Sequence, residues 1–237
     1  NQLNRLIKKI EPLGGQYSYE YDGIGNLISR TDPNGNTVNY SYDALNRLIN
    51  VTYPDTSTVI FSYDPNGNRI TMNDSLGTST YTYDVLNRMK TFTDPFGKTI
   101  GYEYDSNGNR KSLTYPDGKV VQYGYDALNR LSTVTDWLGK TTTYGFDGAG
   151  NLKSVLNPNN TKSIYVYDTA GRLTGLSNTM SDSTVISNYE YTPDGNGNHI
   201  SVVQNEPMIP LIPGQGLSYS HDTENRMTSA DGIVNTF

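Results

Sequence analysis

The chain has 237 residues, a formal net charge of -6, no cysteine and two histidines. The absence of cysteine excludes disulfides, thiol catalysis and cysteine-bound metal, although it leaves the cellular compartment open. Because Lys and Arg are scattered along a chain of negative net charge, a nucleic-acid backbone is a poor partner, and no stretch is long or apolar enough to span a bilayer.

The composition favours ordered β-structure over disorder. Only 34% of the residues are hydrophobic, yet the chain contains 20 tyrosines and 23 glycines. Disordered chains are poor in aromatic residues, so we predict a thin core that is rich in tyrosine.

The N-terminal residues already belong to a repeat, and no signal peptide is visible in this sequence. The chain begins inside one copy at residues 2–6 (Gln-Leu-Asn-Arg-Leu) and stops inside another at residues 227–230. We therefore expect this sequence to be a piece of a longer array.

An aromatic residue followed by Asp recurs about every 21 residues along the chain. Nine near-identical catalytic or metal sites would serve no purpose, so each Asp is predicted to accept backbone N–H groups from the turn that it begins. The pairs are Tyr21-Asp22, Tyr42-Asp43, Tyr63-Asp64, Tyr83-Asp84, Tyr104-Asp105, Tyr125-Asp126, Phe146-Asp147 and Tyr167-Asp168, followed by a stretched copy with Tyr191 and Asp194 and a last copy with His221 and Asp222.

The fourth residue after each of these aromatics is Gly or Asn. These two residue types adopt φ > 0 most readily, so each copy is predicted to turn through a left-handed position here. The residues are Gly25, Asn46, Gly67, Asn87, Gly108, Asn129, Gly150, Gly171 and Asn225, with Gly197 in the stretched copy.

The next position alternates between Arg and Asn, so the true unit is a pair of repeats of about 42 residues. We infer that the two types of copy face different neighbours. Each Arg is predicted to bond turn carbonyls or a neighbouring Asp through its guanidinium fork, in preference to a phosphate. The alternating residues are Arg5, Asn26, Arg47, Asn68, Arg88, Asn109, Arg130, Asn151, Arg172, Asn198 and Arg226.

Each repeat is predicted to contain two strands and two turns. A second aromatic precedes the first by two residues, as in Tyr40/Tyr42 and Tyr123/Tyr125, which places both rings on one face of a strand. An apolar run follows the turn, and it ends at a second turn signal such as residues 94–97 (Asp-Pro-Phe-Gly). We expect the rings of successive repeats to lie in register on adjacent strands and to be mostly shielded. The alternative is that they face outward as platforms for sugar rings.

Two irregular insertions interrupt the period near the C-terminus, at residues 177–190 and 203–217. The first is polar and rich in Ser and Thr. In the second, prolines recur every third residue, which forbids a central strand. That segment is predicted to be an exposed loop, or alternatively a docked segment that covers its own apolar side chains.

Motifs for catalysis and for metal or cofactor binding are missing. Residues 105–109 (Asp-Ser-Asn-Gly-Asn) imitate the start of a calcium loop but lack its Gly at the sixth position and its Glu at the twelfth. Weak surface calcium binding is the alternative there. His199 and His221 have no Cys or Glu pattern beside them that would make a zinc site. We find no nucleophile elbow, phosphate-binding loop or carboxylate pair, so neither a catalytic site nor a cofactor is predicted.

The motif Tyr-Asp-x-x-Gly-Asn or Tyr-Asp-x-Leu-Asn-Arg-Leu, repeated at this spacing with Asp-Pro-x-Gly turns between, resembles the Rhs/YD-repeat family over the whole chain. The resemblance implies hairpins coiled into a spiral β-sheet that encloses a hollow shell, as in bacterial Rhs effectors, insecticidal toxin complexes and teneurins. In that family a core segment severs a C-terminal toxin by self-cleavage. Neither segment is recognisable in this sequence.

The sequence therefore predicts one all-β array over residues 1–237. The resemblance implies a non-catalytic shell segment whose partners are further repeats and an enclosed toxin or effector. It also implies a bacterial protein that is secreted or at the cell surface. The alternative is a cell-surface adhesion array that binds glycans, whereas an enzymatic function would need a chemical constellation that is not found.

Overall fold

The computed structural model describes residues 4–207, 216–221 and 227–231. The described residues form strands and turns and no helix, in agreement with the predicted all-β class. By its internal contacts the chain divides into two compact units, Asn1–Glu103 with Leu113–Lys119 and Tyr104–Ser112 with Val120–Phe237.

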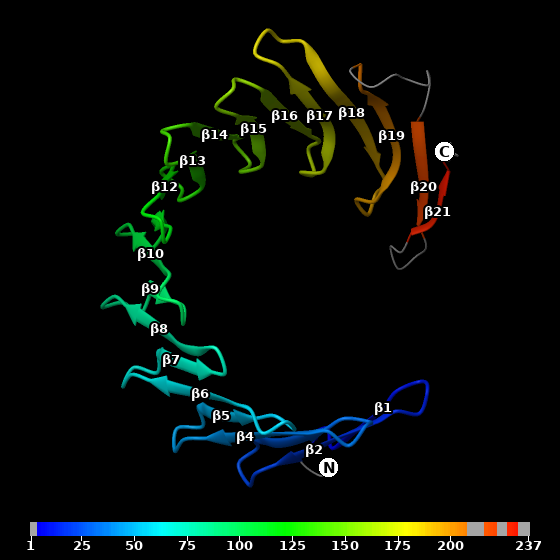
Figure 1. The fold of residues 1–237 in the computed structure, drawn as a ribbon. Coiled ribbons are helices and arrows are strands. Elements are labelled where there is room, and N and C mark those ends of the chain that lie inside the picture. Colours follow the sequence, from blue (N-terminus) through cyan, green and yellow to red (C-terminus); the bar gives the residue numbers. More distant parts are fainter. Residues whose placement is uncertain (1–3, 208–215, 222–226, 232–237) are drawn as a thin grey trace. The chain divides into compact units, whose positions relative to one another are not determined.

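In the first unit each strand pairs antiparallel with the next one along the chain, from β1 to β10 (Figure 1). The result is a simple meander in which every connection is a short turn. The strands are β1 (Lys8–Ile10), β2 (Gln16–Tyr21), β3 (Leu27–Thr31), β4 (Thr37–Tyr42), β5 (Leu48–Thr52), β6 (Thr58–Tyr63), β7 (Arg69–Asp74), β8 (Gly77–Tyr83), β9 (Met89–Thr93) and β10 (Thr99–Tyr104).

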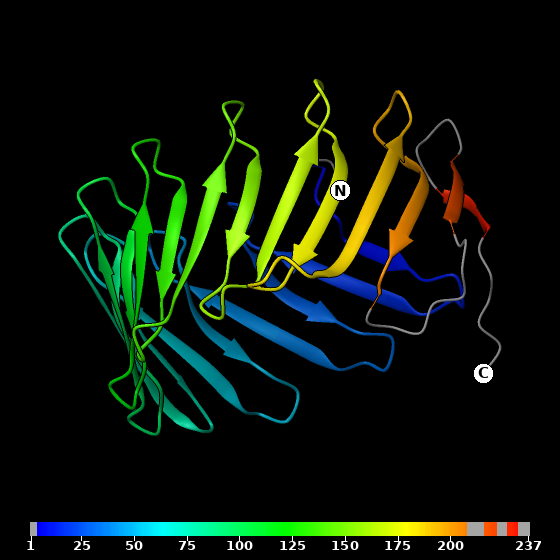
Figure 2. The same ribbon diagram turned by 90° about the horizontal axis from the view of Figure 1, so that it is seen from above.

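The second unit repeats this plan from β12 to β21. Figure 2 shows its green, yellow and orange strands side by side in chain order, joined by turns at alternate edges. The strands are β12 (Val120–Tyr125), β13 (Leu131–Thr135), β14 (Thr141–Phe146), β15 (Leu152–Leu156), β16 (Lys162–Tyr167), β17 (Leu173–Thr179), β18 (Val185–Pro193), β19 (His199–Asn205), β20 (Gly216–His221) and β21 (Met227–Asp231), while β11 (Arg110–Thr114) contains residues of both units.

The two faces of each sheet differ because side chains alternate along a strand. One face carries rings and aliphatic groups, as where Tyr40 is opposite Val51 and Val51 is opposite Val59. The other face carries hydroxyls, and neighbouring strands bond through them, as between Ser62 and Thr71 at 2.5 Å. We call these the aromatic face and the hydroxyl face.

The aromatic face forms a thin core, because the described residues place only a few apolar side chains in nearly complete burial. Val51 is 6% exposed, and Tyr81, Val121 and Val202 are each 8% exposed. Tyr81 lies between Phe92, whose ring centroid is 5.2 Å away, and the Arg69 guanidinium, which is 4.7 Å from the centre of the tyrosine ring. Arginine stacked on rings therefore supplies part of the packing.

The expectation that the rings of successive repeats occupy adjacent strands is wrong. An aliphatic strand lies between them, because each repeat contributes two strands and only the first carries the ring pair. The cross-strand partner of Tyr40 is Val51, and that of Tyr123 is Val134. Most rings are half-buried, so the predicted shielding is only partial.

The first irregular insertion is accommodated within strands. The register of β17 and β18 runs from Gly175 opposite Glu190 to Thr179 opposite Val185, five pairs where the equivalent hairpin of β15 and β16 has three. Its turn keeps the usual form, with the N–H of Met180 bonded to the carbonyl of Thr184. Residues 208–215 of the proline-rich insertion, and with them its predicted loop or docked segment, lie outside the described residues.

Truncation of the most buried ring should measure the strength of the aromatic face. We predict that Tyr81→Ala lowers the free energy of unfolding by about 3–5 kcal/mol, because a large buried aromatic is lost. Thr80→Ala, at the adjacent exposed position of the hydroxyl face, should change it by less than about 0.5 kcal/mol. Equilibrium denaturation of both variants checks this, and equal losses would contradict it.

Candidate functional site

The repeat motif forms a row of turns along one edge of the sheet in each unit. Successive connections of a meander alternate between its two edges, so the turns that begin with the motif Asp all gather at the same one. We call them the Tyr-Asp turns; they are residues 22–26, 43–47, 64–68, 84–88, 105–109, 126–130, 147–151, 168–172 and 194–198, in which the first N–H bonds the last carbonyl.

The Asp carboxylate holds each of these turns together. In the turn of Asp43, one carboxylate oxygen accepts the N–H groups of Leu45 and Arg47, both at 2.9 Å, and the other accepts Nε–H of Arg47 at 2.7 Å. In the turn of Asp64, the backbone N–H and the side-chain amide of Asn68 replace the arginine, both at 2.8 Å. Arg and Asn thus perform the same task within their own turn.

These contacts lower the pKa of the motif carboxyls. The pKa of Asp43 lies below its usual range because the N–H of Arg47 donates to the carboxylate, and the guanidinium of Arg47 adds to the effect. The pKa of Asp64 is lowered first by the side-chain amide of Asn68. Hydrogen bonds to the charged form favour ionisation in both cases.

A left-handed residue precedes the Arg or Asn in every described Tyr-Asp turn, as predicted. The two types of turn differ in angle. In the turns that end in Arg, Asn46, Asn87 and Asn129 have φ between +59° and +62°. In those that end in Asn, φ at the glycine lies between +90° and +106°, a conformation that side-chain-bearing residues rarely adopt. These glycines are Gly25, Gly67, Gly108, Gly150 and Gly197.

Turns that end in Arg contact the next Tyr-Asp turn through its backbone and its ring. Nη1 of Arg47 donates to the carbonyl oxygen of Asp64 at 3.1 Å, and the guanidinium lies 4.8 Å from the centre of the Tyr63 ring. Arg5 makes the same contacts with Asp22 and Tyr21. The predicted role of the arginines in bonding turn carbonyls is confirmed at these positions.

Turns that end in Asn contact the next turn through an amide. Nδ2 of Asn68 donates to Oδ1 of Asn87 at 2.8 Å. Asn26 and Asn109 donate in the same way to Asn46 and Asn129, at 3.2 and 3.0 Å. The left-handed Asn therefore has a second task as the acceptor for the preceding turn.

The motif tyrosines link neighbouring repeats in the opposite direction. The hydroxyl of Tyr63 donates to the carbonyl oxygen of Leu48, in the preceding repeat, at 2.7 Å. Burial raises the pKa of Tyr42, Tyr83 and Tyr167. These hydroxyl bonds are not among the sequence-based expectations, which concern ring packing or sugar stacking, although the preference for Tyr over Phe is a signal that the hydroxyl has a partner. The other bonds are Tyr21 to Leu6, Tyr42 to Leu27, Tyr83 to Arg69, Tyr125 to Arg110 and Tyr167 to Leu152, each between 2.9 and 3.0 Å.

The turn carboxylates accept hydrogen bonds from groups within their own turns. Within the described ranges no group of three or more His, Cys, Asp and Glu side chains is arranged to hold a metal ion. In the calcium-like turn of Asp105, the carboxylate accepts the N–H groups of Asn107 and Asn109, both at 2.9 Å. His199 stacks on the Tyr191 ring, with centroids 4.7 Å apart. Among the described residues, none forms a helix long and apolar enough to cross a membrane.

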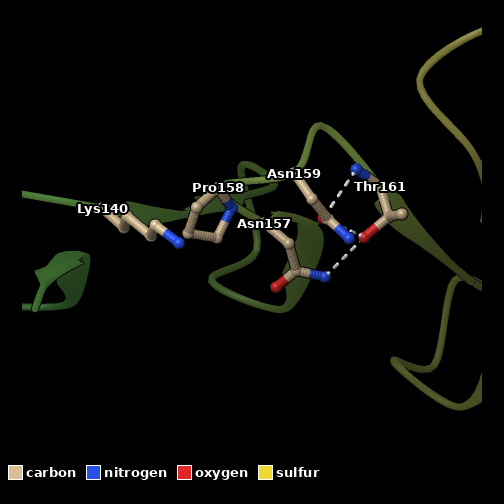
Figure 3. Close-up of a pocket in the computed structure, with 5 residues that line it drawn as sticks. All are labelled: Lys140, Asn157, Pro158, Asn159 and Thr161. Atoms are coloured by element: carbon tan, nitrogen blue, oxygen red, sulfur yellow. Dashed lines mark hydrogen bonds between the residues drawn. The ribbon is translucent and has the colours of Figure 1, made fainter. Parts of the chain in front are cut away.

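A shallow pocket of about 360 Å³ lies at the opposite edge of the second unit (Figure 3). It is lined by Lys140 at the end of one turn and by Asn157, Pro158, Asn159 and Thr161 of the next. Asn157 donates to the Thr161 hydroxyl at 3.0 Å, and that hydroxyl donates to Asn159 at 2.8 Å. The pocket offers amide groups and an amine to a polar ligand, and its lining lacks a nucleophile with an adjacent base.

Comparison with known families identifies the repeat. A family model described as RHS Repeat matches most of the chain, whereas no curated protein matches it in sequence. The model matches overlapping segments at residues 1–37, 21–58, 63–99, 90–120, 104–141, 125–161 and 146–179.

Solved structures share the fold at low sequence identity. The crystal structure of TcdB2-TccC3-TEV matches with a TM-score of 0.76 and 16% identity, over 94% of this chain and 13% of that chain. The crystal structure of TcdB2-TccC3-Cdc42 matches with a TM-score of 0.68 and 14% identity, over 95% and 16%. That of TcdB2-TccC3 without its hypervariable C-terminal region matches with 0.67 and 14%, over 97% and 16%. The chain thus spans a small part of each of these proteins.

The tyrosine hydroxyl can be tested by removal and by addition. We predict that Tyr63→Phe lowers the free energy of unfolding by about 0.5–1.5 kcal/mol, the usual contribution of one hydrogen bond. The reciprocal change Phe146→Tyr should raise it, because a hydroxyl there would reach the carbonyl of Leu131, fifteen residues earlier as for Tyr63 and Tyr167. Urea denaturation checks both variants, and a loss of stability in both would contradict the assignment.

The lowered pKa of the turn carboxyls predicts a pH dependence of stability. A carboxyl whose pKa is lower in the folded state contributes stability above its unfolded pKa of about 3.9 and loses it as the pH falls through the folded value. The melting temperature should therefore be level above about pH 5 and fall increasingly below about pH 4. Asp43→Asn should make the fall shallower, because one of the titrating groups is gone. A melting temperature that stays level at acidic pH would rule this out.

Proposed function

The chain belongs to the RHS repeat family, and we propose that it is one segment of a non-catalytic protein wall that encloses a toxin or effector cargo. The observation that carries the proposal is the continuous strand pairing in each unit, reinforced at Tyr-Asp turns such as those of Asp43 and Asp64 by contacts to the next turn. Each further repeat extends such a sheet by two strands, and because each repeat contacts only its neighbours, the sheet can form a wall without a second layer.

The side chains support a wall more than an active site. The carboxylates, arginines and tyrosine hydroxyls that an enzyme would use are engaged in bonds within and between turns. General acid–base catalysis needs a titratable group within reach of a substrate and with a pKa near the working pH. The motif carboxyls instead have a lowered pKa and stay ionised at neutral pH.

The proposed partners are further repeats of the same polypeptide and the enclosed cargo. The array offers them two faces of different chemistry, one with rings and stacked arginines and one with hydroxyls. We further propose that the complete protein is a bacterial protein that is secreted or displayed at the cell surface, as the family resemblance implies. Residues 1–237 would then form one continuous array within it.

The test is protease protection of the cargo in the intact protein that carries these repeats. Gly67→Val introduces a β-branched residue at φ +90° and should destabilise its turn by about 1–3 kcal/mol. Because cleavage follows the population of the opened wall, the enclosed segment should then be cut about tenfold faster or more. Thr80→Ala is the control, since it changes an exposed hydroxyl only. Equal cleavage rates in the wild type and both variants would refute enclosure.

The alternative function is glycan binding by a surface array. The observation that favours it is the open pocket at Lys140, Asn157 and Asn159, whose amides and amine suit sugar hydroxyls (Figure 3). A glycan-array screen with the wild type and Asn159→Ala distinguishes the two functions. Specific glycan binding that the substitution removes, without a change in melting temperature, would favour adhesion over enclosure.

A further inference from the structure

The strict alternation of the Tyr-Asp turns has a physical cause in the contacts between them. We call turns that end in Arg the Arg turns and those that end in Asn the Asn turns. Every side-chain hydrogen bond described above between neighbouring Tyr-Asp turns is donated by the earlier turn to the later one, as from Arg47 to Asp64 and from Asn68 to Asn87. The row of turns within each unit therefore has a direction, and each turn for which such a bond is described contacts a follower of the other type.

An Arg turn requires room in its follower. The guanidinium of Arg47 donates to the Asp64 carbonyl and covers the Tyr63 ring, while a Cβ added at Gly67 would meet no atom within 4 Å. In two other copies the arginine lies at van der Waals distance from the position that a Cβ on the glycine would take. A Cβ added at Gly25 would lie 3.5 Å from Nη1 of Arg5, and one added at Gly150 would lie 3.8 Å from Nη1 of Arg130. At these two positions a side chain longer than Cβ would compete with the guanidinium for space.

An Asn turn requires an acceptor in its follower. The amide of Asn109 bonds to Oδ1 of Asn129, and the same oxygen accepts the amide of Asn107 at 2.9 Å. Asn68 and Asn66 converge on Asn87 in the same way. A glycine in place of the left-handed Asn would leave both donors without this partner.

We propose that each Tyr-Asp turn is a recognition surface that selects a turn of the other type as its neighbour. An Arg turn fits a hairpin with Gly-Asn at the end of its turn, and an Asn turn fits one with Asn-Arg. If the repeat of Asp43 were skipped, the amide of Asn26 would face Gly67, which has no side-chain acceptor. If the repeat of Asp64 were skipped, the guanidinium of Arg47 would face Asn87 in place of glycine. The alternation thus opposes out-of-order pairing among repeats that are otherwise nearly alike.

One copy departs from the pattern and provides an internal comparison. The Arg turn at residues 168–172 has Gly171 where the other described Arg turns after residue 40 have Asn, and its φ of +77° lies between the two groups. Asn151 donates to its own Asp147 at 3.0 Å, and a Cβ at position 171 would lie 3.9 Å from Oδ1 of Asn151. An Asn at this position has room, and it would supply the acceptor.

The decisive experiment compares two internal deletions in the intact protein. Removal of residues 44–64 joins Asp43 to Pro65 and places an Asn turn directly after the Asn turn of Asn26. Removal of residues 44–84 joins Asp43 to Val85 and restores an Arg turn after it. Selection by type predicts that the shorter deletion has the lower melting temperature and the lower refolding yield. A sheet held by strand pairing alone predicts the reverse, because the longer deletion removes more of it.

A rescue variant separates the acceptor from other effects of the deletion. Adding Gly67→Asn to the shorter deletion restores an oxygen opposite Asn26 and should raise its melting temperature. In the full chain the preceding turn ends in Arg47 and presents no asparagine amide to position 67, so the same substitution only strains the backbone at φ +90° and should lower the melting temperature. An equal effect of Gly67→Asn in the two backgrounds would overturn the proposal.

A double-mutant cycle at the exceptional copy gives an independent measurement. Gly171→Asn should reduce the unfolding equilibrium constant by about two- to tenfold, the range expected for one hydrogen bond. The gain should disappear in the Asn151→Ala background, since the donor is then missing. A gain of the same size in both backgrounds would mean that the introduced asparagine acts only on its own backbone, which would overturn the recognition role. These results do not depend on any cargo, so they stand or fall apart from the enclosing function.

Discussion

A sheet stabilised within a single layer has to hold each strand to the next, and this constraint accounts for most of the features of the chain. The apolar side chains that come closest to full burial are few and scattered, among them Val51 and Tyr81. Most proteins bury their apolar surface between two layers. Here, in the described residues, ring and aliphatic contacts across strands, hydroxyl pairs on the other face and side-chain bonds at the turns replace that second layer.

The Asp carboxylate makes the turn bonds possible because it fixes the side chain that reaches the next turn. Arg47 is held at Nε by Asp43, which leaves Nη1 to bond the Asp64 carbonyl. Asn68 is held by Asp64 in the same way while it bonds Asn87. Exposed ion pairs contribute little alone. Their contribution here is geometric, since a restrained donor loses less conformational entropy when it contacts its neighbour.

The local structure could be predicted from the sequence because it depends on residues within one repeat. The fourth position after each motif aromatic holds only Gly or Asn, and this restriction predicted the left-handed residues. The Asp at the start of each turn predicted that its carboxylate accepts backbone N–H groups of the turn. Apart from the arginine bonds to turn carbonyls, the contacts between repeats could not be predicted, because they depend on which strands are adjacent. The expectation of neighbouring tyrosine strands failed where Val51 lies opposite Tyr40. The hydroxyl bond of Tyr63 to Leu48 has the same origin, as its partner lies fifteen residues away.

Two types of turn also constrain how such an array changes in length. With one type, any repeat could be lost or duplicated, and the contacts at the junction would be the same. With two types that select each other, a change by one repeat creates a mismatch such as Asn26 facing Gly67, whereas a change by two repeats creates none. The pair of repeats is therefore the unit that can be gained or lost without cost at the turns. The regular period of about 42 residues then follows from contacts between neighbours.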